Sequence, residues 1–267
     1  MEVQAVDSSS SDESVSMLRA HGAHVETIPK AHFRHGATRN RIAQSARGEF
    51  LVFLSQDALP VGTTFVTQLV SGFDDPRTAG ICARILPHPE DDPLTRRTVL
   101  VQPEAGEQEQ SFELAESAGL WSLPETRRLQ LLAFNDVASA IRADVFRQIP
   151  FPDVAFGEDV AWAARALSAG WRLRFEPRAV VQHAHCYSPV GAFSRYRIDA
   201  RFRRQVLGQV VRPTLMSVAR GIGYEVREDL RYLARQPKAG RWRALLTSPL
   251  LRSSQVLGQY FGARSNM

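Results

Sequence analysis

Residues 156–177 read FGEDVAWAARALSAGWRLRFEP, and this stretch predicts a helix followed by a strand. Two adjacent carboxylates, Glu158 and Asp159, stand ahead of an apolar, helix-forming run. Gly170 is a helix-stop signal, and the residues after it alternate between apolar and charged, as in a half-buried strand. A carboxylate pair at the mouth of a helix can supply a general base. It can also cap the helix and complement its dipole, and the residues by themselves leave both interpretations open.

The next residues add nitrogen ligands to this region. VVQHAH at 180–185 places His183 and His185 at the end of the predicted strand. A carboxylate base and a histidine pair thus occur within thirty residues of one another.

Strands and helices alternate in the first part of the chain. Apolar patterns predict strands at 3–6, 24–28 and 50–54, and helices at 11–20 and 37–46. This order predicts a parallel α/β sheet.

Further along, the pattern changes twice. We expect a helix at 63–73 and a strand at 80–85, after which residues 88–133 lose their periodicity and predict mobile loops around a partly helical insertion. From Ser188 onward the pattern is helical, and prolines predict breaks at Pro213, Pro237 and Pro249.

Polar side chains follow three of the predicted strands, at the sheet edge where α/β proteins bind ligands. The residues are Asp7, Ser8 and Ser9 after the first strand, Arg39 and Asn40 after the second, and Gln56 and Asp57 after the third. An acidic side chain at such an edge can hold a divalent cation against a diphosphate, with histidine as a further ligand. Each group also has a structural alternative. The first can be a capped loop, the second a surface arginine, and the third a lone aspartate at the end of a strand.

The charge distribution separates the chain into two parts. Residues 186–267 carry 15 Lys and Arg against 4 Asp and Glu, whereas residues 1–185 carry 18 against 24. An acidic body argues against a core that recognises nucleic acid, while the basic tail suits an anionic lipid surface, a phosphate-bearing substrate or nucleic acid. A solvated helical face is the alternative for the tail.

Composition excludes several classes of protein. The chain has 267 residues with 44% hydrophobic and 23% charged content, which is typical of a soluble globular protein. No run is long and apolar enough for a spanning helix, and no secretory signal is visible. Cys82 and Cys186 fit neither a disulfide framework nor a zinc site, so we expect reduced thiols in a cytoplasmic protein.

Several of these motifs together resemble the GT-A glycosyltransferases of family 2, especially the bacterial rhamnosyltransferase-like branch. The matching stretches are VDSSSSDES at 6–14, FRHGATRN at 33–40, GEFLVFLSQDALP at 48–60, ASAIRADVFRQIPFPDVAFGEDVAWAARALSAGWRLRFEPRAVVQHAH at 138–185, and YS at 187–188. The resemblance covers about 185 residues and is weak in 88–133. It implies a GT-A, Rossmann-like α/β domain over 1–187, with 88–133 as an acceptor-side insertion and 188–267 as a basic helical tail.

The resemblance also assigns roles. Asp159, beside Glu158, matches the catalytic base, and Asp57 with His183 or His185 matches the site for Mg²⁺ or Mn²⁺. Donor-side positions are Asp7, Ser8, Ser9, Arg39, Asn40, Gln56 and Asp57. Two departures stand out: Ser55-Gln56-Asp57 replaces the paired carboxylates of other branches, and a first strand and helix are absent before Met1. The second departure leads us to expect an N-terminally truncated domain.

The implied function is that of an inverting glycosyltransferase. A sugar, with rhamnose as one candidate, would pass from a nucleotide-diphospho-sugar to a saccharide or lipid-linked acceptor in cell-surface polysaccharide synthesis, with UDP- and GDP-sugars as alternatives to dTDP-rhamnose. The tail would attach the protein peripherally to the inner face of the cell membrane, and no nucleic-acid partner is expected. The alternative function is a catalytically silent module of the same fold that binds sugar nucleotides or the membrane surface.

Overall fold

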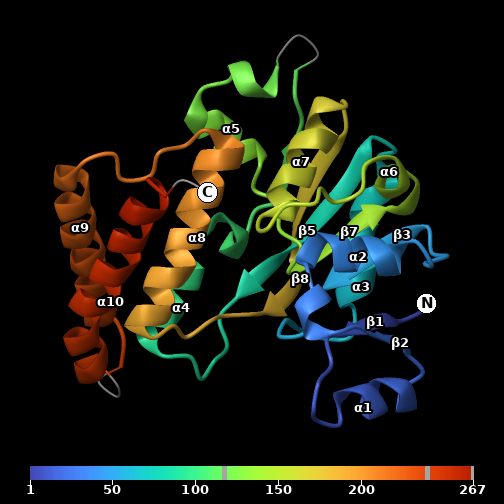
Figure 1. Ribbon diagram of the computed structural model, residues 1–267, viewed down its shortest axis with the longest axis horizontal. Helices are drawn as coiled ribbons and strands as arrows, with labels where there is room; N and C mark the ends of the chain where they lie inside the picture. Colours follow the sequence, from blue (N-terminus) through green and yellow to red (C-terminus); the bar gives the residue numbers. More distant parts are fainter. Residues whose placement is uncertain (116–118, 238–240, 266–267) are drawn as a thin grey trace. The chain divides into compact units, whose positions relative to one another are not determined.

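The computed structural model describes residues 1–115, 119–237 and 241–265. The chain divides into two compact units, and each is described by itself. The first comprises residues 1–58, 62–83 and 108–179, and the second comprises residues 59–61, 84–107 and 180–267. Figure 1 shows the helices and strands of both, coloured along the chain.

A strand, a helix and a second strand open the first unit, as the sequence predicts. β1 (Gln4–Asp7) and β2 (His24–Thr27) are parallel, and α1 (Ser14–Ala20) connects them. The pairing continues beyond β2, because the Ile28 N–H donates to the Asp7 carbonyl over 2.8 Å. Asp7 therefore stands at the carboxyl end of β1, where the chain enters the loop before α1.

The predicted strand at 50–54 belongs to a different, larger sheet. Its strands are β3 (Phe50–Leu54), β4 (Leu59–Pro60), β5 (Thr78–Leu86), β6 (Gln110–Phe112), β7 (Ala138–Arg142) and β8 (Arg172–Gln182). They lie in the order β3-β7-β5-β8-β4, with β6 paired to β8. β7 runs antiparallel to both β3 and β5, and β4 and β6 run antiparallel to β8.

The parallel sheet predicted from the alternation of strands and helices is therefore confirmed for β1 and β2 and wrong for β3. The physical reason is that periodicity reports which residues are buried but not the direction in which a distant strand pairs. β7 follows a long connection and lies between β3 and β5, running antiparallel to both, so the sheet is mixed.

The helices of the first unit pack around a core of large apolar side chains. They are α2 (His35–Ala43), α3 (Phe65–Val70), α5 (Glu125–Leu131), α6 (Ala143–Gln148) and α7 (Glu158–Ser168). Trp162 of α7 is fully buried, its ring centroid lies 5.0 Å from that of Phe134, and its indole N–H donates to the Ile149 carbonyl over 2.7 Å. This anchoring fixes the start of α7, where Glu158 and Asp159 stand.

Residues 88–133 contain more regular structure than the sequence predicts. α4 (Pro93–Leu100) begins after Asp92, whose Oδ1 accepts from the N–H groups of Leu94 and Thr95 at 2.9 and 3.3 Å. β6 and α5 follow, so the stretch carries two helices and a strand as well as loops. Residues 116–118 of this segment lie outside the described residues.

The second unit ends in three long helices, as the pattern from Ser188 predicts. α8 (Pro189–Leu207) is followed by α9 (Leu215–Ala234) and α10 (Arg241–Gly262). Pro213 and Pro237 lie outside the helices, but Pro249 lies inside α10, so the predicted break at Pro249 is wrong. An interior proline costs a helix about 3 kcal/mol, which close packing of α10 against α8 and α9 offsets here.

That packing is close enough to exclude side chains. A Cβ atom added at Gly262 would lie 2.1 Å from the Arg197 carbonyl oxygen of α8, a distance that no side chain tolerates. Glycine at this position is thus required by the contact between the two helices.

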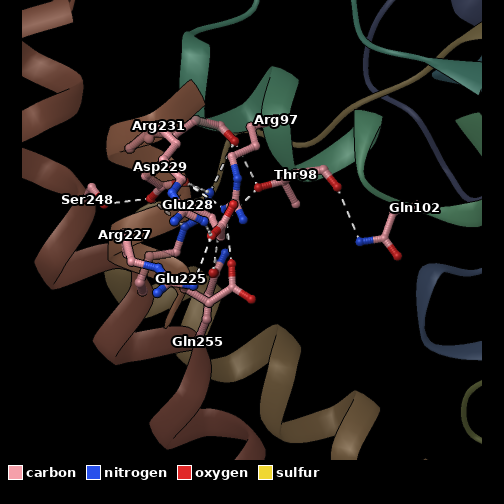
Figure 2. Close-up of polar contacts among 12 residues, drawn as sticks. Arg97, Thr98, Gln102, Glu225, Arg227, Glu228, Asp229, Arg231, Ser248 and Gln255 are labelled. Atoms are coloured by element: carbon pink, nitrogen blue, oxygen red, sulfur yellow. Dashed lines mark hydrogen bonds and ion pairs between the residues drawn. The ribbon is translucent and has the colours of Figure 1, made fainter. Parts of the chain in front are cut away.

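A buried charge network joins α4, α9 and α10 (Figure 2). Asp229 of α9 is fully buried and accepts from Arg97 Nη1 over 2.8 Å, from Arg252 Nε and Nη2 over 2.8 Å, and from Ser248 Oγ over 2.5 Å. Glu225 accepts a further bond of 3.0 Å from Arg97. Because these charges are buried, removal of one partner leaves the others without a compensating charge, which lowers the stability of the fold.

Two expectations from composition are met by the described residues. Within 1–115, 119–237 and 241–265, no helix combines the length and apolar content needed to cross a bilayer. Neither cysteine is in a disulfide; Cys82 is buried and Cys186 is exposed.

Candidate functional site

The start of α7 carries the carboxylate pair that the sequence singles out. Gly157 precedes the helix, Glu158 is buried, and Asp159 is partly buried. Asp159 Oδ1 accepts the N–H of the next residue, Val160, over 2.7 Å, within the first turn of the helix. The N-cap residue itself is Gly157, which has no side chain to cap the helix. The second oxygen of Asp159, Oδ2, lies 3.4 Å from the backbone nitrogen of Asp136. One oxygen of Asp159 is thus engaged within its own helix, and the other is directed to a different segment.

Arg39 links α2 to this helix start. Its Nη1 lies 2.8 Å from Glu158 Oε1 and 3.1 Å from Asp136 Oδ2. The two helices approach closely at Gly36, where an added Cβ would lie 3.0 Å from the Pro152 carbonyl oxygen and 3.3 Å from the Glu158 Cβ. The small residue one turn before Arg39 therefore lets the guanidinium reach both carboxylates.

Asp136 is a member of this cluster that sequence reasoning missed. It is buried and lies in the segment just before β7. The Ser55 N–H donates to the Val137 carbonyl over 2.8 Å, so this segment lies against the residues that follow β3. The sequence feature that could have indicated Asp136 is the polar pair Asn135-Asp136, which comes shortly before a strand whose first four residues are buried.

Burial and crowding of like charges change the acidity of the cluster. The pKa of Asp159 is raised to about 6, first by burial and then by the nearby Glu158 carboxylate, against the lowering effects of two backbone N–H groups and the Arg39 charge. Burial also raises the pKa of Asp136 well above its usual range, with Asp159 adding to the shift and Arg39 opposing it. The cluster can therefore accept a proton close to neutral pH, which is what a general base must do.

Asp7, the last residue of β1, is a further buried carboxylate, and its partners lie in the loop that follows. Asp7 accepts the Ser10 N–H at 3.0 and 3.3 Å through its two oxygens, and hydrogen bonding from Ser10 lowers the Asp7 pKa. Ser9 Oγ donates to the Ile28 carbonyl over 2.8 Å, with its backbone at φ 64°, and Ser8 is partly buried. This loop presents an ionised carboxylate at the carboxyl edge of the parallel pair.

Asn40 has a visible structural contact. Its Nδ2 donates to the Phe151 carbonyl over 2.8 Å, and its Oδ1 accepts the Phe151 N–H over 3.0 Å. The amide therefore ties α2 to the segment ahead of α7. The predicted contacts of Arg39 and Asn40 with a donor remain predictions.

The predicted metal ligands come from different stretches. Gln56 and Asp57 are exposed in a turn after β3, which the Ala58 N–H closes by donating to the Ser55 carbonyl over 3.0 Å. In the second unit, the His183 N–H donates to the Leu86 carbonyl over 2.9 Å, and the rings of His183 and His185 have centroids 4.7 Å apart. A carboxylate oxygen and imidazole nitrogens are donors that suit Mn²⁺.

A comparison with protein families identifies the first part of the chain. The model described as "Glycosyl transferase family 2" matches residues 1–140, which is more than half of the sequence. The chain belongs to glycosyl transferase family 2. It is therefore a glycosyltransferase, of a family whose members invert the configuration at the anomeric carbon.

Two curated relatives are similar over most of the chain. The O-antigen chain rhamnosyltransferase WbaN of Salmonella anatum is 27% identical over 252 residues, which are 91% of this chain and 75% of the relative. RfbN of Salmonella typhimurium, another O-antigen chain rhamnosyltransferase, is 27% identical over 253 residues with the same coverage. The family 2 enzyme is thus a distant homologue of O-antigen rhamnosyltransferases.

A solved structure shares its fold. The mannosyltransferase PcManGT from Pyrobaculum calidifontis, solved with GDP-Man and Mn²⁺, superposes with a TM-score of 0.53 at 17% identity, covering 98% of this chain and 76% of that one. The predicted GT-A fold is confirmed, with a mixed central sheet and C-terminal helices.

Proposed function

We propose that this family 2 glycosyltransferase moves a sugar from a nucleotide-diphospho-sugar to a saccharide or lipid-linked acceptor in cell-surface polysaccharide synthesis. The observation that carries the proposal is the carboxylate Asp159, with a pKa raised to about 6 and one oxygen directed away from its own helix. Similarity to two O-antigen rhamnosyltransferases makes dTDP-rhamnose the first donor to test, followed by UDP- and GDP-sugars.

Asp159 is the proposed general base. With a pKa of about 6 it is mostly ionised at neutral pH and still basic enough to take a proton. It would remove the proton of the acceptor hydroxyl as that oxygen attacks the anomeric carbon, from the face opposite the departing nucleoside diphosphate. General-base assistance of this kind contributes about 10²–10⁴ in rate. Glu158, the adjacent carboxylate that pairs with Arg39, would make Asp159 more basic and is the second proposed catalytic residue.

The donor would lie along the carboxyl edges of the strands. We assign Asp7, Ser8 and Ser9 to the nucleotide, because their loop leaves β1 at that edge with a buried, ionised carboxylate. Arg39, Asn40, Gln56 and Asp57 are the further proposed donor-side residues. The catalytic domain in this proposal spans 1–187, with 88–133 on the acceptor side.

Asp57, His183 and His185 are the proposed ligands of Mg²⁺ or Mn²⁺. β4 supports this grouping, because Leu59 pairs with Gln182 and Pro60 with Val181. Asp57 precedes Leu59 by two residues and His183 follows Gln182 directly, so chain connectivity brings both toward the end of the same pairing. The donor types of the three side chains also fit a shared ion. When bound, such an ion supplies positive charge that stabilises the departing diphosphate.

Turnover of nucleotide-sugars by the purified chain with Mn²⁺ tests the proposed function. We expect release of nucleoside diphosphate from one member of a panel of dTDP-rhamnose, UDP-glucose and GDP-mannose when a membrane extract containing lipid-linked saccharides is added. Binding without turnover would favour the alternative, a catalytically silent sugar-nucleotide-binding module. Neither binding nor turnover would contradict both.

A second proposed property is attachment to the inner face of the cell membrane through the basic tail of residues 188–267. One face of α10 carries exposed apolar side chains, namely Trp242, Leu246, Leu250, Leu257 and Phe261. At 3.6 residues per turn these positions fall within about 100° of arc. The buried positions Ala244, Ser248 and Arg252 lie on the other side of the helix. An exposed apolar stripe with Arg243 at its edge is the pattern of an interfacial helix.

A further inference from the structure

Asn135 is a buried amide without hydrogen bonds. Its side-chain oxygen and nitrogen both lack a partner among the described residues, and the residue is only 8% exposed. Leaving a buried polar group unpaired costs folding free energy, so such groups are rare in a core unless something outside the protein pairs with them. A group that offers one acceptor and two donors matches neighbouring hydroxyls on a sugar ring.

The position of Asn135 indicates which part of a bound donor it would contact. The next residue, Asp136, contacts Asp159 Oδ2 through its backbone nitrogen at 3.4 Å. Two residues on, the Val137 carbonyl accepts the Ser55 N–H over 2.8 Å, beside the turn that carries Asp57. The segment 135–137 therefore connects the proposed base to the turn that holds the proposed diphosphate-side ligand. In a transfer reaction the transferred sugar must lie between these two groups.

We propose that Asn135 binds hydroxyl groups of the transferred sugar and thereby contributes to donor specificity. This inference rests on the proposed function, because it takes the Asp159 end as the acceptor side and the Asp57 end as the diphosphate side.

The structure also supplies a matched control. Ser139, on β7 four residues later, has a side-chain oxygen that is equally without a hydrogen-bond partner in the described chain, but the residue is fully buried. Replacing either residue by alanine removes a buried polar group that has no hydrogen-bond partner among the described residues. Asn135 keeps 8% exposure and Ser139 none, so only the first lies at the edge of the accessible surface; its amide oxygen and nitrogen are buried, and contact with a sugar requires the side chain to turn outward.

The test compares Asn135→Ala and Asn135→Ser with Ser139→Ala. Calorimetric titration of the full chain with Mn²⁺ measures the affinity for dTDP-rhamnose, UDP-glucose and GDP-mannose and for the corresponding nucleoside diphosphates. For whichever nucleotide-sugar binds the parent, we expect the Asn135 variants to weaken binding about tenfold and to leave the nucleoside diphosphate within about twofold. Ser139→Ala should change neither affinity.

Thermal unfolding gives the second measurement. If Asn135 serves a substrate, its variants should keep or raise the Tm of the free protein, because function rather than folding retains the amide. A lowered Tm with unchanged sugar-nucleotide affinity would overturn the inference and show a structural role through bound water. Equal weakening of nucleotide-sugar and nucleoside diphosphate would also overturn it.

These outcomes are separable from failure of the proposed function. Equilibrium binding of the donor does not require proton transfer, so a mistaken role for Asp159 leaves the Asn135 result interpretable. If the parent binds none of the three nucleotide-sugars, the proposed function fails in its donor class, and the inference fails with it.

Discussion

Arg39 Nη1 lies 2.8 Å from Glu158 Oε1, which joins α2 to the start of α7 between residues 119 positions apart. The same nitrogen lies 3.1 Å from Asp136 Oδ2, so one guanidinium serves two carboxylates beside Asp159. Its charge lowers the pKa of Asp159 against the effects of burial and of Glu158. The ion pair thus helps to determine at which pH the proposed base is ionised.

The pH dependence of transfer should show this effect. Because the base must be deprotonated, kcat/KM should fall as pH falls through about 6. Arg39→Gln removes a charge that stabilises the ionised Asp159, so the acidic limb of the profile should move to higher pH. Arg34→Gln, which loses only an exposed pair with Asp153 at 2.7 Å, is the control and should leave the limb in place. An unmoved limb in Arg39→Gln would contradict the coupling.

Asp159→Asn should preserve the fold and donor binding but lower transfer by about 10² or more, because an amide cannot accept the proton. Asp144→Asn is a matched control, since Asp144 Oδ1 accepts the Val145 N–H over 2.8 Å much as Asp159 accepts that of Val160. Steady-state rates and calorimetric donor titration measure the two effects. Transfer within tenfold of the parent would exclude Asp159 as the base.

Asp57→Ala should weaken Mn²⁺-dependent binding of nucleoside diphosphate and leave thermal stability nearly unchanged, because the side chain is exposed. His183→Ala and His185→Ala should differ, with one resembling Asp57→Ala and the other mild. Calorimetry with and without Mn²⁺ measures these changes, and His24→Ala, an exposed histidine on β2, is the control. Metal-dependent affinity that is unaltered in all three variants would rule out this ligand set.

Asp229→Leu should destabilise the helices of the second unit. It leaves Arg97 and Arg252 buried without the carboxylate that both now contact, and removing one partner of a buried ion pair costs about 3 to 5 kcal/mol. Glu228→Gln, which loses the solvent-accessible pair with Arg231 at 2.6 Å, should cost less than about 1 kcal/mol. Urea unfolding compares the two, and equal losses would contradict a structural role for the buried network.

Membrane attachment should depend on the apolar stripe of α10. Vesicles containing anionic lipid should co-sediment the parent at low salt and release it at high salt, because each basic residue near the surface contributes about 1 kcal/mol. Leu246→Glu with Leu250→Glu should abolish co-sedimentation. Met17→Glu changes an exposed apolar side chain of α1 and should not. If the parent itself stays in the supernatant, the membrane proposal is wrong.

Local patterns in the sequence determined much of the fold. The strands at 4–7, 24–27 and 50–54 and the helix of residues 158–168 were predictable because burial periodicity is encoded within each segment. The carboxylate pair at 158–159 and the histidines at 183 and 185 were visible for the same reason, as chemistry-bearing residues at the ends of patterned elements. Membership of family 2 is shown by the match to residues 1–140, which precede these motifs.

Only the tertiary structure decided the surroundings of the proposed base. Asn135 and Asp136 lie in a short segment without periodicity. They matter because Val137 of that segment pairs with Ser55, 82 residues away, and Asp136 contacts Asp159, 23 residues away. Tertiary contacts also explain three further features. β7 lies between β3 and β5, Pro249 lies inside α10, and Asp229 is fully buried. Each depends on contacts between distant segments, whose energies exceed the local preferences that a sequence pattern reports.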